Sequence, residues 1–164
     1  MEQLTIKPIG IIHTGFKEKK GTPIQGGLFP DTEGRAEIFP EYHECLKDLD
    51  GFSHLIFLYH FNQSGSWKPL VVPYLDDTER GVFSTRAPRR PNPIGMTVIE
   101  LVKIEKGVIY FNRADMLEGT PLVDIKPFVP KIDAPEIKKL GWLEKRKLDR
   151  NSEDDHPGTA DERF

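Results

Sequence analysis

Cysteine is almost absent from this 164-residue chain, which contains only Cys45. One cysteine cannot form an intrachain disulfide, and it excludes a zinc site built from several thiolates. Only Lys47 lies close to Cys45 as a basic neighbour, so the activated thiol of a cysteine enzyme is not expected here. The pattern is typical of a reducing compartment and predicts a cytoplasmic location.

Long apolar runs and a strong basic excess are also missing. The longest apolar run, residues 55–59, is far too short to cross a bilayer, and the N-terminus lacks the basic and apolar regions of a signal peptide. We therefore expect no membrane partner. The net charge of −3 does not by itself indicate a nucleic-acid binder, so an anionic partner would have to meet a local basic patch.

Familiar catalytic and nucleotide-binding motifs do not occur in the sequence. There is no GxGxxG after a strand, no phosphate-binding GxxxxGK[ST] and no GxSxG nucleophile elbow. His54 and His60 are six residues apart and so face the same side of an expected strand. No ligand pair has a spacing diagnostic of a metal site, and the sequence predicts no metal.

Short strands separated by turns dominate the pattern. We expect strands near residues 4–13, 35–39, 52–61, 69–74, 82–85, 96–104, 108–111 and 122–125, with a short helix over 41–49. Lys106-Gly107 predicts a tight hairpin turn between two of these strands. The pattern favours an antiparallel barrel or sandwich. We expect one domain over residues 1–143 and a charged, flexible tail over 144–164.

A stiff basic loop stands out in the middle of the chain. The segment RAPRRPNPIG carries Arg86, Arg89 and Arg90 among prolines, which exclude a helix. Two interpretations remain open. The arginines bind an anionic ligand through their planar donor forks, or they pair on the surface with Asp76, Asp77 and Glu79.

Two further loops suit ligand binding, at residues 23–25 and 117–121. Gly21, Gly26 and Gly27 beside the first loop and Gly119 in the second allow close backbone approach, and the side chains offer amide and hydroxyl donors. A ligand with a carboxylate and a flat base would fit such loops, which points to an amino-acid-bearing nucleotide or to RNA.

GVFSTRAPRRPNPIGMT, DMLEGTPLVDIKPFVP and the opening KPIGIIHT together resemble the sequence blocks of the TrmO-like (YaeB/VirR-like) family. The resemblance runs from about residue 6 to 130. It implies a mainly β fold, a small antiparallel β-barrel with short helices and long ligand-binding loops, that works as a homodimer. It also implies an S-adenosylmethionine-dependent enzyme that methylates N6 of threonylcarbamoyl-adenosine at position 37 of its tRNA substrate.

Site residues are likewise implied by the resemblance. The contacts expected for S-adenosylmethionine are Pro23, Ile24, Gln25, His60, Phe61, Arg86, Met96, Leu117, Glu118, Gly119 and Thr120. The RNA-binding candidates are Arg89, Arg90, Asn92 and Lys126. Arg86 is expected to hold the carboxylate of the methyl donor or an RNA phosphate. No catalytic base is assigned, with Asp115 and Asp124 as candidates only.

Other functions remain open for a protein with these loops. The barrel could hold S-adenosylmethionine as a non-catalytic sensor, or it could methylate a small molecule. Donor binding without turnover would identify the sensor, and the mass of the reaction product would identify the small-molecule enzyme.

Overall fold

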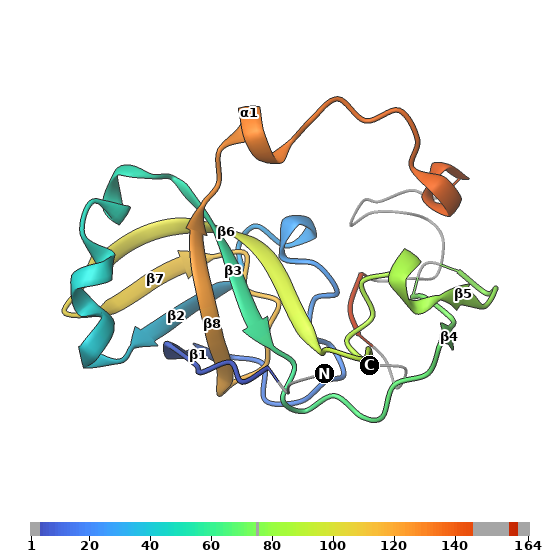
Figure 1. The fold of residues 1–164 in the computed structure, drawn as a ribbon, viewed down its shortest axis with the longest axis horizontal. Helices are drawn as coiled ribbons and strands as arrows, with labels where there is room; N and C mark the ends of the chain where they lie inside the picture. Colours follow the sequence, from blue (N-terminus) through green and yellow to red (C-terminus); the bar gives the residue numbers. More distant parts are fainter. Residues whose placement is uncertain (1–3, 75, 146–157, 161–164) are drawn as a thin grey trace.

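Six antiparallel strands close into a barrel in the computed structural model, which describes residues 4–74, 76–145 and 158–160. Around the barrel the strands follow the order β1-β2-β7-β6-β3-β8 (Figure 1). They are β1 Gly10–Thr14, β2 Glu33–Ile38, β3 His54–His60, β6 Ile94–Glu105, β7 Val108–Asn112 and β8 Thr120–Pro127. The predicted mainly β fold with a small antiparallel barrel is confirmed.

Alternation of buried and outward side chains builds the barrel interior. Leu55, Phe57 and Tyr59 on β3 point inward, because neighbouring residues of a strand face opposite sides. The rings of Phe57 and Phe111 meet edge to face, with their centroids 5.1 Å apart, in the middle of this core. The interior is therefore filled by side chains and leaves the ligand site to the loops.

The predicted hairpin turn is confirmed. Lys106 and Gly107 join β6 to β7 and have φ values of 50° and 79°. Both residues lie in the left-handed region, which is the backbone of the tight turn whose twist matches two antiparallel strands.

Several predicted element boundaries are wrong. The strand predicted over 4–13 begins only at Gly10, and Leu4 is 82% exposed, because Pro8 lacks the N–H that a ladder needs. The helix predicted over 41–49 is a 3₁₀-helix, η2 Pro40–Leu46, followed by η3 Leu49–Gly51. Asp48, with φ of 63°, interrupts the run.

A second predicted strand is also wrong. Residues 82–84 form a 3₁₀ turn, η4 Val82–Ser84, directly after β5 Arg80–Gly81. The short strand β5 pairs only with β4 Leu70–Val71, where a longer strand over 69–74 was expected. This two-stranded sheet lies beside the barrel (Figure 1).

The chain beyond β8 leaves the barrel and crosses to the side of the two-stranded sheet (Figure 1). It passes through α1 Pro130–Asp133 and η5 Gly141–Lys145. There the indole Nε1 of Trp142 donates a hydrogen bond of 2.8 Å to the carbonyl of Ser84. Among the described helices, none has the length and apolar character that crossing a bilayer requires.

The predicted tail falls mostly on residues outside the described part, and the domain boundary at 143 stays a prediction. For residues 158–160 the structure differs from a free tail. Thr159 forms an antiparallel bridge with Pro23, and Ala160 is buried against Leu117. These three residues pack on the loop that follows β1.

We expect Gly95→Ala to destabilise the fold by about 1–3 kcal/mol, the usual cost of overpacking a core. A methyl group at Gly95 would collide with the ring of Tyr59, which lies against this glycine. Urea denaturation followed by circular dichroism measures the loss. Gly81→Ala is the control, because its added methyl group meets no atom within 4 Å. Equal stability of the two variants would contradict this packing.

Candidate functional site

A cavity of about 590 Å³ lies beside one end of the barrel. Its walls are the 23–25 loop, Tyr59 near the end of β3, Phe61 just after that strand, the segments 71–74 and 83–89, Asp115, and Trp142 with Leu143. The cavity is large enough for a small molecule of nucleotide size. Segments far apart in the sequence therefore meet here, among them two of the three loops that the sequence predicted to bind a ligand.

Arg86 joins those two loops directly. Its Nη1 donates a hydrogen bond of 2.6 Å to Oε1 of Gln25. Arg86 is exposed and borders the cavity, and its guanidinium has further N–H donors besides the one that binds Gln25. A guanidinium in this position suits a carboxylate or a phosphate.

Asp115 forms the polar floor of the cavity and is 5% exposed. Its Oδ2 accepts a hydrogen bond of 2.7 Å from the backbone N–H of Gly26. The hydroxyl of Thr97 donates to the carboxylate, at 2.7 Å from Oδ1 and 2.8 Å from Oδ2. The hydroxyl of Tyr59 also donates to Oδ1, over 3.3 Å. One carboxylate thus ties together β3, β6 and the start of η1 Gly26–Leu28.

Burial shifts the pKa values of this network upward. Loss of solvent raises the pKa of Asp115 from its ordinary 3.8 to about 6, although hydrogen bonds from Thr97, Gly26 and Tyr59 and the charge of Arg86 act in the opposite direction. Burial, followed by the charge of Asp115, raises the pKa of Tyr59 well above its ordinary value. Tyr59 is therefore a neutral hydrogen-bond donor at neutral pH.

The 23–25 loop is held from more than one side. Asp115 binds the N–H of Gly26, and Arg86 binds Gln25. From the C-terminal side, the carbonyl of Gly158 accepts a hydrogen bond of 2.9 Å from the N–H of Ile24. The loop consequently has a fixed shape before any ligand binds, which lowers the entropy cost of binding.

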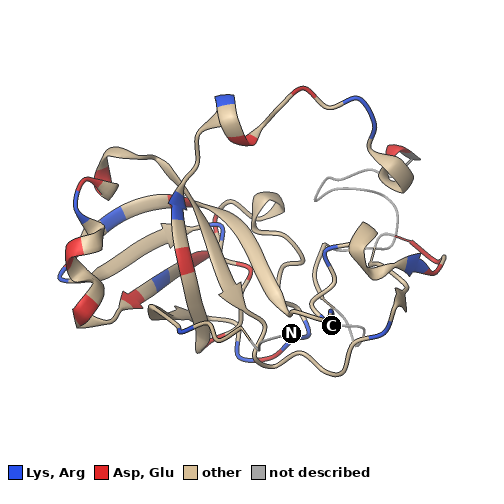
Figure 2. Ribbon diagram, in the orientation of Figure 1, with Lys and Arg blue, Asp and Glu red and all other residues tan. Residues whose placement is uncertain are grey.

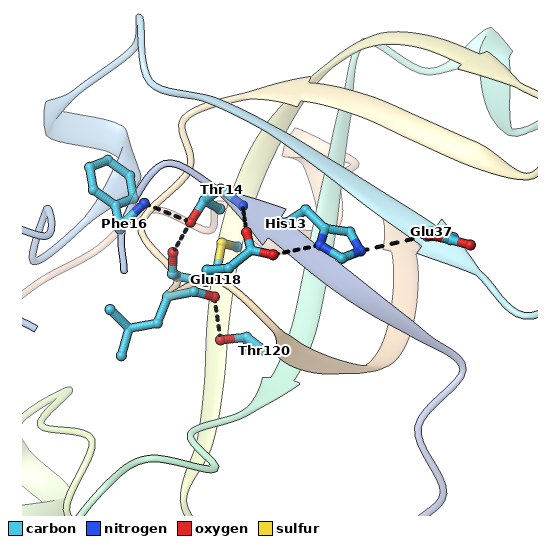
Figure 3. A network of polar contacts seen from close by, with 8 residues as sticks. His13, Thr14, Phe16, Glu37, Glu118 and Thr120 are labelled. Carbon is cyan, nitrogen blue, oxygen red and sulfur yellow. Dashed lines mark hydrogen bonds and ion pairs between the residues drawn. The ribbon is translucent and has the colours of Figure 1, made fainter. Parts of the chain in front are cut away.

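The third predicted loop is bound to β1 (Figure 3). Glu118 accepts hydrogen bonds of 2.7 Å from Nδ1 of His13 and 2.8 Å from the N–H of Thr14. The hydroxyls of Thr14 and Thr120 donate to the carbonyls of Met116 and Leu117, each over 2.8 Å. Burial alone would raise the pKa of Glu118, but its bonds to His13 and Thr14 outweigh burial and hold that pKa below its usual value.

The predicted site residues divide into two groups. Pro23, Ile24, Gln25, Phe61, Arg86 and Arg89 border the cavity. His60, Met96, Leu117, Glu118, Gly119, Thr120, Arg90, Asn92 and Lys126 do not border it. Their ligand contacts stay predictions.

Members of the second group lie in different places. His60 and Met96 are exposed on the outer face of β3 and β6, whereas Leu117 is buried against Ala160. Nζ of Lys126 forms an ion pair of 2.6 Å with Asp124 on β8. Asp124, the second candidate base, is likewise absent from the cavity wall.

Sequence reasoning missed Tyr59, Phe83 and Trp142 as cavity residues. The inward position of Tyr59 follows from strand alternation, which was a usable signal. Phe83 and Trp142 reach the cavity only because β4, β5 and η5 pack beside the barrel. No local pattern reports that packing.

One arginine of the basic loop, Arg90, stabilises the loop itself. Nη1 of Arg90 donates to the carbonyls of Thr85 and Ala87, over 3.1 Å and 3.3 Å. Asp76, one of the proposed surface partners, forms an ion pair of 2.8 Å with Arg80. Between η4 and β6 the ribbon carries basic residues and no acidic ones (Figure 2). The segment is thus a locally positive border of the cavity.

Comparisons with known proteins identify the family of the chain. The family model described as the tRNA-methyltransferase O N-terminal domain matches residues 11–134. A probable S-adenosyl-L-methionine-binding protein of Pyrococcus abyssi is 49% identical over 150 residues, covering 90% of this chain and 82% of the relative. The tRNA (adenine(37)-N6)-methyltransferase of Escherichia coli is 36% identical, over 79% of this chain.

Solved structures of the same family are also similar to this chain. TrmO from Pseudomonas aeruginosa superposes with a TM-score of 0.72 at 36% identity, over 86% of this chain. The chain spans 63% of that structure and 60% of the Escherichia coli enzyme. Less than two thirds of each of these relatives is therefore represented here.

We expect Asp115→Asn to flatten the dependence of stability on pH. Because the folded pKa of Asp115 is raised from 3.8 to about 6, its protonated form favours the fold, and stability is lost as the pH rises through this range. A shift of this size corresponds to about 3 kcal/mol. The neutral asparagine avoids this loss of stability, and its amide oxygen can still accept the hydrogen bond from the N–H of Gly26. Urea denaturation between pH 4 and pH 8 measures the stability of both proteins.

Asp124→Asn is the matched control, since Asp124 is a partly exposed carboxylate paired with Lys126. It should keep the wild-type pH dependence, because the buried carboxylate of Asp115 is unchanged in this variant. A wild-type profile in Asp115→Asn would contradict the buried charge.

Proposed function

The chain belongs to the tRNA-methyltransferase O family, and we propose that it transfers a methyl group from S-adenosylmethionine to N6 of threonylcarbamoyl-adenosine at position 37 of tRNA. The observation that carries the proposal is the cavity bordered by the hydrogen-bonded pair Arg86 and Gln25, with Asp115 at its floor. The family match and the methyl-donor binding and methyltransferase activity named for the relatives support it.

The cavity residues fit the chemistry of the methyl donor. Arg86 offers guanidinium donors for its carboxylate, and Gln25 offers an amide. Phe61, Ile24 and Val71 supply apolar surface for the flat adenine. When bound, S-adenosylmethionine supplies the electrophilic methyl group on its sulfonium.

Positioning is the main contribution of these residues to the reaction. Methyl transfer needs the acceptor nitrogen in line with the bond between the methyl group and sulfur, and a rigid site provides that alignment. Asp115 contributes by holding Gly26, and through it the 23–25 loop. Its carboxylate already accepts from Gly26, Thr97 and Tyr59, which favours a positioning role over that of a general base.

The basic border of the cavity suits an RNA substrate. Arg86 and Arg89 border the cavity, while Asn92 lies exposed on the same loop. Phosphate contacts from arginines would orient the RNA, and the cavity would select the base. Arg90 contributes by holding the loop, and Lys126 on β8 is a more distant candidate.

A homodimer fits the outer surface of β3 and β6. Their paired outward residues are Ile56 with Val98, Leu58 with Met96, and His60 with Ile94. Ile94 and Met96 are 41% and 45% exposed. His60 and Met96 do not border the cavity of their own chain, and a second copy docked on this face would let them complete a shared donor site. We place the dimer in the cytoplasm with its tRNA substrate.

Arg86→Ala should weaken binding of S-adenosylmethionine about ten- to a hundred-fold, since a hydrogen bond to a charged group contributes about 1.5–3 kcal/mol. Arg86→Lys should restore little, because an ammonium lacks the planar fork. Calorimetry measures donor affinity, and nucleoside mass spectrometry after incubation with tRNA measures transfer. Lys103→Ala, which removes an exposed cation paired with Glu105, is the control.

The same assay separates the competing functions. The proposed reaction requires a methylated product from tRNA that carries threonylcarbamoyl-adenosine and much less from tRNA that lacks it. Donor binding without any labelled nucleoside would support the sensor instead. A labelled small metabolite would support the small-molecule enzyme.

Leu58→Lys should convert the dimer to monomers, because a charge in the centre of a buried apolar interface is strongly unfavourable. Within the monomer this lysine stays at the barrel surface beside Asp124, its partner in the ladder. Analytical ultracentrifugation reports the mass. Val102→Lys, at a 57% exposed position farther along β6, is the control and should remain dimeric. A wild-type monomer would refute the dimer.

A further inference from the structure

Phe83 borders the cavity, yet 78% of its surface is exposed. An exposed phenylalanine forgoes the stabilisation that burial would give. An exposed apolar ring at the rim of a cavity is therefore a candidate contact for a ligand.

The exposure of Phe83 is enforced by its surroundings. Its neighbour Val82 is 3% exposed, and the N–H of Val82 donates a hydrogen bond of 2.9 Å to the carbonyl of Pro69. On the other side, the carbonyl of Ser84 accepts a hydrogen bond of 2.8 Å from Nε1 of Trp142. With both neighbours anchored, η4 presents the ring outward on a fixed turn.

A guanidinium lies beside this ring. The guanidinium carbon of Arg90 lies 6.0 Å from the ring centroid of Phe83, and Arg90 is held there by the carbonyls of Thr85 and Ala87. Arg86 borders the same cavity, and the sequence has no acidic residue between Glu79 and Glu100. In a chain of net charge −3, this is a local basic patch around an aromatic ring.

An aromatic ring framed by arginines matches the chemistry of unpaired nucleotides. Bases in single-stranded loops stack on aromatic side chains, while arginines meet the phosphates on either side. An apolar surface of a protein partner would pack on the ring, but it would offer no anionic group to the arginines. The combination thus favours RNA over a protein partner.

We propose that Phe83 stacks on a nucleobase that flanks the methylated adenosine in the single-stranded loop of the RNA substrate. The proposal rests on the proposed function, since it takes that adenosine to enter the cavity beside the bound methyl donor. Because Phe83 and Arg86 border the same cavity, the neighbouring nucleotide of an adenosine bound inside would lie at this rim. Phe83 would then help to hold the loop open.

The test measures the affinity of the full chain for a fluorescent anticodon stem-loop RNA by anisotropy. Phe83→Leu should weaken binding about ten- to a hundred-fold, and Phe83→Tyr should restore it, because stacking needs a ring. The salt dependence of binding should not change, since no phosphate contact is lost. Phe52→Leu is the control, because Phe52 is a 40% exposed phenylalanine away from the cavity.

Three results would overturn the proposal. The first is that Phe83→Leu binds RNA as tightly as the wild type. The second is that the wild type binds no RNA. The third is that Phe83→Leu loses donor affinity and changes mass in ultracentrifugation, which would assign the ring to a contact between copies. RNA binding that depends on Phe83 without methyl transfer would refute the proposed reaction alone.

Discussion

The buried carboxylate of Asp115 is the interaction around which the site is arranged. It is surrounded by hydrogen-bond donors from Gly26, Thr97 and Tyr59, which come from different elements of the chain. A buried charge is tolerated only when it is well hydrogen-bonded, and the raised pKa of Asp115 shows that burial still carries a cost. Losing one of these donors would therefore disturb the barrel and the 23–25 loop together.

Close packing of glycines allows this arrangement. Gly95 leaves space for the ring of Tyr59, whose hydroxyl reaches Asp115, and an added methyl group at Gly26 would collide with the carbonyl of Arg113. The block RAPRRPNPIGM therefore contributes packing as well as charge. Its arginines border the cavity or brace the loop, while its glycine sets how closely β6 approaches β3.

The cavity joins two parts of the chain with different physical roles. The barrel supplies a rigid wall, and the two-stranded sheet with η4 and η5 supplies an aromatic and basic rim. A closed barrel has no free strand edges and so keeps a constant shape. The loops that extend from the barrel can differ in chemistry while the barrel fold stays the same. A site built on such loops can therefore bind a methyl donor without a GxGxxG motif, which this sequence lacks.

Local pattern was sufficient for the strands of the barrel, the Lys106-Gly107 turn and the basic proline-rich loop, because alternation, left-handed turn residues and proline act over a few neighbours. It failed for residues 82–84, where valine and phenylalanine favour a strand, because the pairing with β4 ends at Gly81 and the backbone then turns. Only the tertiary structure brought Arg86 to Gln25, Asp115 to Gly26 and residues 158–160 to Pro23. Those contacts join residues at least 61 positions apart, and closing such loops depends on the packing of the whole barrel rather than on any local preference.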